Sequence, residues 1–443
     1  MIEIDRIVSG GRVLLMDEKM TIIANGSIAI HGRDIVAVGR KEDIETRYHA
    51  ADVIDAGGGI VMPGLINGHT HVAMTCFRGM ADDLPLMDWL NDNIFPAESK
   101  NVNTDLAYWG SLLACAEMIR SGTTTFCDMY IFEDETAKAA KLSGMRCLLG
   151  EVLFDFPSPN FKTPEDGLAY TERLLEKWAD DEIVNIFVEP HALYTCSKPL
   201  LLDSKALANR YNAPLGLHLL ENKTERDQLE AKLGKGAVPF LREIGLLDER
   251  LIAFHCVCMD DKDIQMFAHH GCKVIHNPES NMKLASGVAP IPEMIAGGVC
   301  VGLGTDGCAS NNNLDMFQEM DSAAKLHKVH RLDPVVMDAQ TVLRTATREC
   351  ARALGMDHLV GEIAPGKKAD IIIIDTHKPH LTPMYHECSH LVYTVAGADV
   401  DTVLINGQVV MKNRRLLTID EDEVMAKVQE IGARIKAGMG IAD

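Results

Sequence analysis

The chain has 443 residues, of which 64 are acidic and 43 basic, so its formal net charge at pH 7 is -21. This balance excludes a general binder of the nucleic-acid backbone, because that function requires a basic face. With 47% hydrophobic and 24% charged residues the chain is not disordered, and its length allows one large barrel plus a smaller domain.

The N-terminal segment lacks the features of an export signal. Its first residues include Glu3 and Asp5, and no apolar core precedes a cleavage site. The sequence has no run of about 18 apolar residues, which excludes a membrane-spanning helix. Its 12 cysteines are scattered without a CxxC pair, as is typical of reduced thiols. We therefore expect a cytoplasmic protein with neither a membrane nor a nucleic-acid partner.

Both ends of the chain show the short alternating apolar runs of β-strands. Near the N-terminus these are residues 12–16 and 26–39, and near the C-terminus residues 369–375 and 403–410. Glycines divide the first region into hairpin-like pieces. We expect residues 1–61 and 356–443 to form one small β-sandwich domain, with a terminal helix after its last strand.

Residues 62–355 alternate short apolar strands with longer helical stretches, which is typical of repeated βα units. Eight strands are predicted, the number that closes an α/β barrel of the TIM type, (β/α)8, with helices such as 105–120 and 224–233 outside. The strands are expected in the segment ending at residue 69 and at 123–128, 147–152, 185–189, 215–218, 251–255, 273–276 and 300–306.

Four candidate metal ligands stand at the ends of three predicted strands. They are His69 and His71 on the first, His218 on the fifth and Asp306 on the eighth. In such barrels the carboxyl ends of the strands converge on the active site, and a His-x-His on an extended chain points both rings to one side. This set suits one divalent ion, with Zn²⁺ as our expectation, although Fe²⁺ and Mn²⁺ accept the same ligands.

The fourth predicted strand contains no lysine that could carry a bridging carbamate, so we expect a single metal ion rather than two. Two further residues are candidates for catalysis beside Asp306. Glu221 follows His218 by three positions and could move a proton, or it could simply favour the start of a helix. His255 ends the sixth strand and could orient the attacking water, or it could be a structural histidine.

Longer strings of the sequence resemble the amidohydrolase superfamily. They are residues 63–71, 218–221, 255–257, 276–284 and 304–312. Residues 82–90 and 95–98, with Pro190-His191 and residues 194–197, more closely resemble the 5'-methylthioadenosine/S-adenosylhomocysteine deaminases. The resemblance covers nearly the whole chain, and it implies metal-dependent hydrolytic deamination of an adenosine-type nucleoside to the inosine analogue and ammonia. It also implies a homo-oligomer.

The same resemblance implies roles for individual residues at the substrate. Glu98 would hold the ribose hydroxyls, His191 would contact the purine and Glu221 would act at purine N1. Trp89 lies in one of the matching strings and is expected to bind substrate. The chemistry agrees, since a carboxylate can accept two hydrogen bonds from a vicinal diol. Without the resemblance, Glu98 could equally be a helix-start acid and His191 a loop residue.

One position departs from the family pattern. Members that take S-adenosylhomocysteine grip its carboxylate with arginines, one of them at the end of the third strand, where this chain has Glu151. Residues 160–167 also contain no arginine, and Lys162 could compensate only as a flexible point charge. We therefore expect Glu151 to face the substrate and to favour neutral 5' groups: 5'-deoxyadenosine, 5'-methylthioadenosine or adenosine. Alternatively, Glu151 is a solvated strand-end acid.

Other functions are open to the same scaffold. A deaminase of a free base or pterin, or a triazine chlorohydrolase, would use similar metal ligands, but Glu98 argues for a ribose. An amide-bond hydrolase would usually require two metal ions and the missing lysine. A non-catalytic scaffold protein would be expected to have lost ligands that this chain retains.

Overall fold

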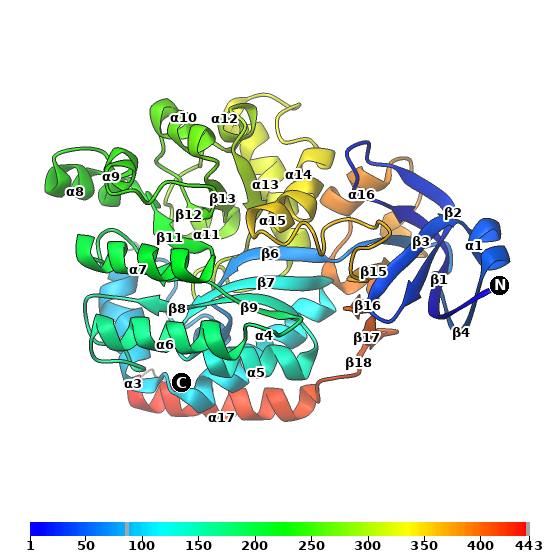
Figure 1. Cartoon of the computed structure of the whole chain (residues 1–443), viewed down its shortest axis with the longest axis horizontal. Helices are drawn as coiled ribbons and strands as arrows, with labels where there is room; N and C mark the ends of the chain where they lie inside the picture. The colour runs from blue at the N-terminus through cyan, green and yellow to red at the C-terminus, as the bar shows by residue number, and fades with distance from the viewer. Residues whose placement is uncertain (85–87, 440–443) are drawn as a thin grey trace.

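The computed structural model describes residues 1–84 and 88–439. A (β/α)8 barrel and a β-sheet built from both ends of the chain lie side by side (Figure 1), which confirms the predicted fold class. Residues 85–87, which belong to one of the strings that resemble the deaminases, lie outside the described residues. Within those described ranges, no helix is long and apolar enough to cross a membrane.

The described ends of the chain form one nine-stranded sheet in the order β18-β17-β16-β15-β5-β1-β2-β3, with β4 beside β1. Strand β1 pairs with β4 over its first part and with β5 over its second. It changes partner at Gly10, whose φ is 78°, and Gly11, where a Cβ would lie 2.5 Å from Val61. The strands are β1 (Ile2–Leu14), β2 (Ile22–His31), β3 (Asp34–Arg40), β4 (Tyr48–Asp55), β5 (Ile60–Pro63), β15 (Ile371–Ile374), β16 (Val400–Ile405), β17 (Gln408–Lys412) and β18 (Arg415–Leu416).

Strands that are far apart in this sheet nevertheless share one core. Ile28 of β2, Ile371 of β15 and Leu404 of β16 belong to a single buried cluster. The sheet therefore folds over on itself, so that its apolar side chains are enclosed between two layers as in a sandwich. The antiparallel pair of β5 and β15 joins the N-terminal strands to the C-terminal ones.

The barrel strands form two parallel ladders, β6-β7-β8-β9/β10 and β11-β12-β13-β14. All but one of their residues in β6, β7, β8 and β11 to β14 are buried, as expected of strands covered on both faces. Their bounds are β6 (Leu65–Thr70), β7 (Thr123–Tyr130), β8 (Arg146–Leu153), β9 (Val184–Ile186), β10 (Glu189–Pro190), β11 (Leu215–Leu219), β12 (Leu251–His255), β13 (Lys273–His276) and β14 (Cys300–Leu303).

Individual bonds close the barrel where the two ladders meet. On one side the backbone N–H of Gly216 donates to Val188, and that of His218 donates to His191. On the other side Asn67 of β6 uses both ends of its amide on Thr305: its Nδ2 donates to the hydroxyl (2.7 Å), and its Oδ1 accepts from the backbone N–H (3.0 Å). The first and last strands are thus held together beside the residues predicted to bind metal.

Three differences between the observed and the predicted strands affect where residues near the site lie. The fourth strand is split into β9 and β10 around residues 187 and 188, and the eighth ends at Leu303, so that Asp306 lies in the loop that follows. Pro63, which lies within the segment 62–355 predicted to form the barrel, belongs to β5 of the other sheet. The first and last residues of a strand depend on its hydrogen bonds to neighbouring strands, which an apolar run in the sequence does not reveal.

The outer layer of the barrel contains helices that begin with clear sequence signals. Asn103 caps α4, Thr163 caps α6 and Ser197 caps α7, each accepting backbone N–H bonds of the first turn. These and neighbouring helices are α3 (Phe95–Asn101), α4 (Thr104–Arg120), α5 (Glu133–Ser143), α6 (Pro164–Lys177), α7 (Lys198–Tyr211), α8 (Lys223–Leu233), α9 (Ala237–Glu243), α10 (Asp261–His270), α11 (Pro278–Lys283), α12 (Ile291–Ala296), α13 (Met316–Arg331), α14 (Ala339–Thr345) and α15 (Arg348–Ala353). Shorter elements are α1 (Lys41–Arg47), α16 (Glu387–Tyr393), η1 (Val72–Phe77), η2 (Trp89–Ile94), η3 (Pro379–Leu381) and η4 (Gly397–Asp399).

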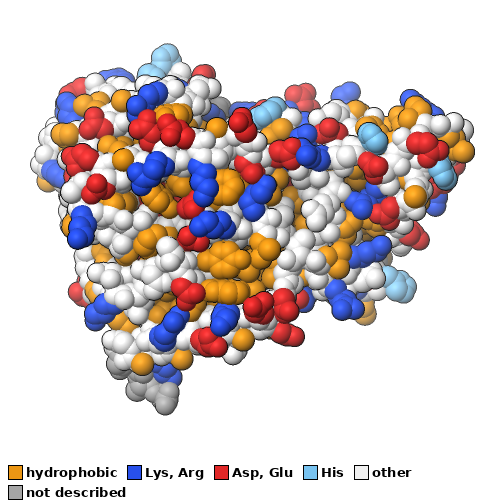
Figure 2. Space-filling model, turned by 60° about the horizontal axis from the view of Figure 1, so that its bottom comes forward, with side chains coloured by type: hydrophobic (Ala, Val, Ile, Leu, Met, Phe, Trp, Pro, Cys, Tyr) orange, Lys and Arg blue, Asp and Glu red, His pale blue; other side chains and the backbone are white. Residues whose placement is uncertain are grey.

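The last helix, α17 (Glu421–Met439), belongs by its packing to the barrel and not to the β domain in which we expected it. It lies along α4 at the bottom of Figure 1, with Val424, Ile431 and Ile435 buried. Ion pairs from Arg120 to Glu421 and from Arg434 to Asp105 hold it there. Figure 2 shows acidic and basic side chains interspersed over this part of the surface, with hydrophobic side chains gathered near its middle.

Candidate active site

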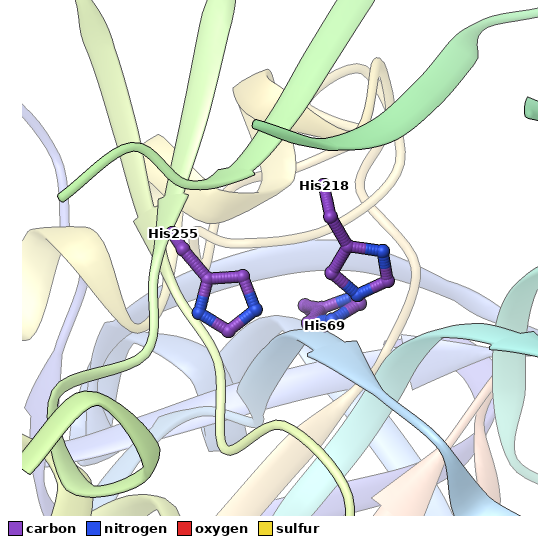
Figure 3. A group of neighbouring side chains, drawn as sticks. All are labelled: His69, His218 and His255. Carbon is purple, nitrogen blue, oxygen red and sulfur yellow. The ribbon is translucent and has the colours of Figure 1, made fainter. Parts of the chain in front are cut away.

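The predicted metal ligands come together at the carboxyl ends of the barrel strands. One ligand atom each from His69, His71 and Asp306 lie within 4.8 Å of one another, and the same holds for His69, His218 and His255. The rings of His69 and His218 have centroids 4.9 Å apart, and Figure 3 shows them with His255 around a common space. His71 Nε2 lies 3.1 Å from Asp306 Oδ1.

Backbone carbonyls orient two of the histidines. His71 Nδ1 contacts the carbonyl oxygen of Met129 at 2.5 Å, and His218 Nδ1 contacts that of His191 at 3.1 Å. Because a carbonyl only accepts, each Nδ1 carries the hydrogen and Nε2 is the ring nitrogen left for a metal. Both rings therefore present the atom that binds a metal. Burial alone would lower the pKa of His71, but the hydrogen bond and charge of Asp306 outweigh it and raise this pKa to about 9.

Hydrogen bonds to both oxygens hold the carboxylate of Asp306 in place. The hydroxyls of Ser280 and Ser310 both donate to Oδ2, at 2.6 and 2.8 Å, and the backbone N–H of Gly307 donates to Oδ1 at 2.8 Å. Burial alone would raise the pKa of Asp306, but His71, with smaller contributions from His255 and His69, outweighs it and holds the pKa well below its usual range. Asp306 is thus an anion whose Oδ1 faces the histidines.

These residues fit a divalent metal. Both ring nitrogens of His69 are buried and have no hydrogen-bond partner among the described residues. Burial holds the pKa of His69 and His218 well below the usual value, so both rings are neutral, the form in which imidazole binds a metal. Neutral imidazole nitrogens and one carboxylate oxygen make a donor set typical of zinc.

His255 stands beside this cluster in an unusual backbone conformation. Its φ is 68°, and that of Asp306 is 63°, both in the left-handed region that non-glycine residues rarely adopt. His255 Nδ1 lies 2.9 Å from Asn281 Oδ1, which fixes the ring and leaves Nε2 free. Such conformations cluster at functional sites, where surrounding bonds hold a side chain in place.

Glu221 lines the same cavity as His71, His218, His255 and Asp306. Burial raises the pKa of its carboxyl group above the usual value. Its position depends on a residue that we did not predict, Glu225, whose carboxylate accepts backbone N–H bonds from Leu220 (3.0 Å) and Glu221 (2.7 Å). The only sequence signal for this role is the position of Glu225 in the first turn of α8.

The predicted substrate residues Trp89, Glu98 and His191 also line this cavity. Burial raises the pKa of Glu98 to about 7, opposed by a hydrogen bond from the Tyr130 hydroxyl to its Oε1 (2.7 Å). His191 Nδ1 lies 2.8 Å from the Thr195 hydroxyl, and burial lowers the pKa of His191 to about 3, so its ring is neutral. Tyr130 was not predicted, because the expected second strand ended at residue 128.

Glu151 does not line the cavity, which corrects the expectation that it faces the substrate. Its neighbour Val152 does so, and Glu151 points away because successive side chains of a strand alternate. Its carboxyl group is fully buried and accepts bonds from the backbone N–H of Glu133 (3.0 Å) and from Asn160 Nδ2 (2.8 Å). It is therefore not a solvated acid either. The lining also does not include Lys162.

Comparison with known proteins places this site in a family context. A model of the amidohydrolase family matches residues 60–410. A 5-methylthioadenosine/S-adenosylhomocysteine deaminase of Syntrophus aciditrophicus is 61% identical over 436 residues, which cover 98% of each chain. A 5'-deoxyadenosine deaminase of Methanosarcina mazei is 44% identical over 435 residues, covering 98% of this chain and 99% of that protein.

A solved structure agrees over the full length. An adenosine deaminase from Xanthomonas campestris with bound zinc superimposes with a TM-score of 0.97 at 35% identity, covering 98% of this chain and 99% of the other. The family model and the relatives extend across all the strands that carry the candidate ligands.

Proposed function

The chain belongs to the amidohydrolase family, and from this premise we propose that it hydrolytically deaminates adenosine-type nucleosides at purine C6. It is a hydrolase of non-peptide C–N bonds, and the products are the inosine analogue and ammonia. The observation that carries the proposal is one cavity that holds a buried carboxyl group for the ribose, Glu98, together with the metal-ligand cluster and Glu221.

The residues of the cavity divide the chemistry among them. His69, His71, His218 and Asp306 would hold one divalent ion, which when bound supplies Lewis-acid activation of water near neutral pH. The free Nε2 of His255 and the carboxylate of Asp306, which line the same cavity, would orient the attacking water. Glu221, whose pKa is raised by burial, would deliver a proton to purine N1 as C6 is attacked.

Glu98, His191 and Trp89 would bind the nucleoside. The neutral ring of His191 is anchored through Nδ1 and offers its other nitrogen to the purine. Glu98 would accept hydrogen bonds from the ribose hydroxyls, a contact that a free base, a pterin or a triazine cannot make. This residue favours a nucleoside over those alternatives.

The lining of the cavity supports a preference for neutral 5' groups, on grounds other than Glu151. In the described ranges, no arginine or lysine lines it. Ile94 and Phe95, which precede Glu98 in the chain, line the same cavity, so the ribose end of a substrate would meet apolar surface. A terminal carboxylate would lose water there without gaining a cation. The expected substrates are 5'-deoxyadenosine, 5'-methylthioadenosine and adenosine.

We further propose zinc as the metal, since the ligand set suits it and the Xanthomonas campestris structure contains it. All 12 cysteines are free, which supports a reducing compartment such as the cytoplasm. A homo-oligomer, and the absence of nucleic-acid and membrane partners, stay predictions, as do the boundaries of residues 1–61, 62–355 and 356–443.

The test is ammonia release by zinc-loaded protein from the three expected nucleosides, S-adenosylhomocysteine, adenine and guanine. We expect turnover of the three nucleosides, weaker turnover of S-adenosylhomocysteine and little turnover of the bases. Faster turnover of a base would refute the role given to Glu98. Equal or faster turnover of S-adenosylhomocysteine would refute the preference for neutral 5' groups while leaving the deaminase intact.

A further inference from the structure

Three consecutive residues at the end of β7 each hold a different part of the site. Asp128 Oδ1 accepts the backbone N–H of Val72 at 2.7 Å, directly after the His-x-His. The carbonyl of Met129 orients His71, and the hydroxyl of Tyr130 donates to Glu98. The first two contacts support the metal cluster. The third is the one that reaches the candidate ribose site.

We propose that Tyr130 is a positioning residue that sets the selectivity of the enzyme for ribosides, by holding the Glu98 carboxylate in the orientation that accepts the two ribose hydroxyls. The proposal rests on the proposed function, because it assumes that a nucleoside binds in this cavity. It adds a residue whose contribution is made through Glu98 and not by chemistry at the purine.

The contacts of Glu98 divide its two oxygens. Oε1 accepts the Tyr130 hydroxyl at 2.7 Å, a distance typical of a bond from O–H to a carboxylate. The other oxygen, Oε2, has no such partner within the described residues, and Glu98 as a whole lines the cavity. Each carboxylate oxygen can accept two hydrogen bonds, so Oε1 keeps one free lone pair beside its bond to Tyr130. Each oxygen of Glu98 can therefore still accept a hydrogen bond from one hydroxyl of a vicinal diol.

Tyr130 is suited to act as a permanent donor. The residue is almost fully buried, and burial holds the pKa of its phenol well above the usual value. The hydroxyl therefore stays protonated and favours the ionised form of Glu98, which accepts hydrogen bonds and cannot donate one. Loss of this hydroxyl would leave Glu98 free to rotate and easier to protonate in its buried position.

Tyr130 also lies near a metal ligand, which offers a competing explanation for any defect. The centroids of the Tyr130 and His71 rings are 6.2 Å apart. A phenylalanine at this position keeps the ring beside His71 and removes only the hydroxyl. Tyr130→Phe therefore separates the contact with Glu98 from packing against the metal cluster.

The experiment compares adenosine with 2',3'-dideoxyadenosine, which lacks both ribose hydroxyls. In Tyr130→Phe we expect kcat/KM for adenosine to fall about tenfold, mainly through KM, the size expected for a lost bond to a charged group. For 2',3'-dideoxyadenosine we expect no change beyond about twofold. Inosine and 2',3'-dideoxyinosine provide a second readout, because their dissociation constants can be measured by calorimetry without turnover and should show the same contrast.

Two controls define the outcome. In a Glu98→Gln background, adding Tyr130→Phe should not lower kcat/KM for adenosine any further. Tyr108→Phe on α4 is the matched control, because it removes a tyrosine hydroxyl outside the cavity. The zinc content of Tyr130→Phe should equal that of the wild type. Equal losses on both nucleosides, or no loss on either, would overturn the proposal. A wild type that turns over neither nucleoside would instead refute the proposed function, and the inosine pair would then decide the role of Tyr130.

Discussion

Ser280 donates a 2.6 Å hydrogen bond to Oδ2 of Asp306, and this bond leaves the opposite carboxylate oxygen to face the histidines. Ser310 donates to the same oxygen. Partners of this kind orient a metal ligand, and their loss typically weakens metal binding by about 10- to 100-fold. The loop that follows β14 thus contains one candidate ligand, Asp306, together with Ser310, which supports it.

We therefore expect the double variant Ser280→Ala, Ser310→Ala to bind zinc at least about tenfold more weakly than the wild type. The dissociation constant can be measured by competition with a chelating dye. Ser204→Ala, which changes an equally buried serine on α7, is the matched control. Unchanged zinc affinity in the double variant would show that Asp306 needs neither hydroxyl for its orientation.

The raised pKa of Glu98 predicts how nucleoside binding depends on pH. Burial raises this pKa to about 7, so the carboxylate proposed to accept the ribose hydroxyls prevails above about pH 7 and is lost as the pH falls. The KM for adenosine should therefore rise below pH 7, by up to about tenfold per pH unit. The KM for 2',3'-dideoxyadenosine should change less, because other titrating groups affect both nucleosides alike. Parallel pH profiles would contradict a role for Glu98 at the ribose.

Glu225 should affect the rate through the position of Glu221. Its carboxylate fixes the backbone N–H groups of Leu220 and Glu221, so Glu225→Ala releases the segment that carries the proposed proton donor. We expect kcat to fall at least about tenfold with the zinc content unchanged. Gln228→Ala, at an exposed position of the same helix, is the control. If kcat keeps its wild-type value, the position of Glu221 does not depend on Glu225.

A buried acid below the site predicts a pH-dependent stability. Glu189 on β10 is fully buried, and its pKa is raised well above the usual value, by burial first and by Asp128 second. In the unfolded chain the pKa of a glutamate is about 4.3. Because the pKa of Glu189 is higher in the folded chain, its contribution to stability is complete below about pH 4.3 and is lost as the pH rises toward the pKa of the folded state. Above the unfolded value, each further pH unit costs about 1.4 kcal/mol until the folded pKa is reached.

Glu189→Gln removes this titration and should make the free energy of unfolding less dependent on pH between about pH 5 and about pH 8. The measurement is urea unfolding of the zinc-loaded protein at both pH values. Glu243→Gln, at an exposed position of α9, is the matched control, although its own pKa is lowered by Lys235. The same slope in the wild type and in Glu189→Gln would exclude Glu189 as the source of the pH dependence.

The barrel and the position of the candidate metal cluster could be predicted from two regular features of the sequence. One is the alternation of apolar strands with helical stretches, and the other is the alternation of side chains along a strand. Seven of the eight predicted apolar runs end in a polar residue, and parallel strands bring those ends to one rim, so the sequence predicts that His69, His218 and Asp306 converge. The face on which a residue lies was harder to predict. Glu151 and Val152 are adjacent, and only the observed register of β8 shows that Val152 faces the cavity and Glu151 faces Asn160.

The supporting contacts could not be predicted for a related reason. Tyr130 and Glu98 are 32 positions apart in the sequence and Ser280 and Asp306 are 26 apart, and each pair meets only in the folded chain. A side chain that donates a hydrogen bond leaves no periodic signal. The family resemblance supplied the residues proposed to touch the substrate, whereas the residues that hold those in place emerged only from the three-dimensional contacts.

The pairing of β5 with β15 has a consequence for how the protein is made. Strand β5 leaves the ribosome before the barrel, and β15 leaves after it, so this edge of β5 finds its partner only when nearly the whole chain has been synthesised. Until then β5 exposes unpaired N–H and C=O groups and an apolar sequence, both of which promote aggregation. A chain that stops short of β15 retains that exposed edge. The C-terminal strands therefore cover the exposed edge of β5 only in molecules that also contain the entire barrel.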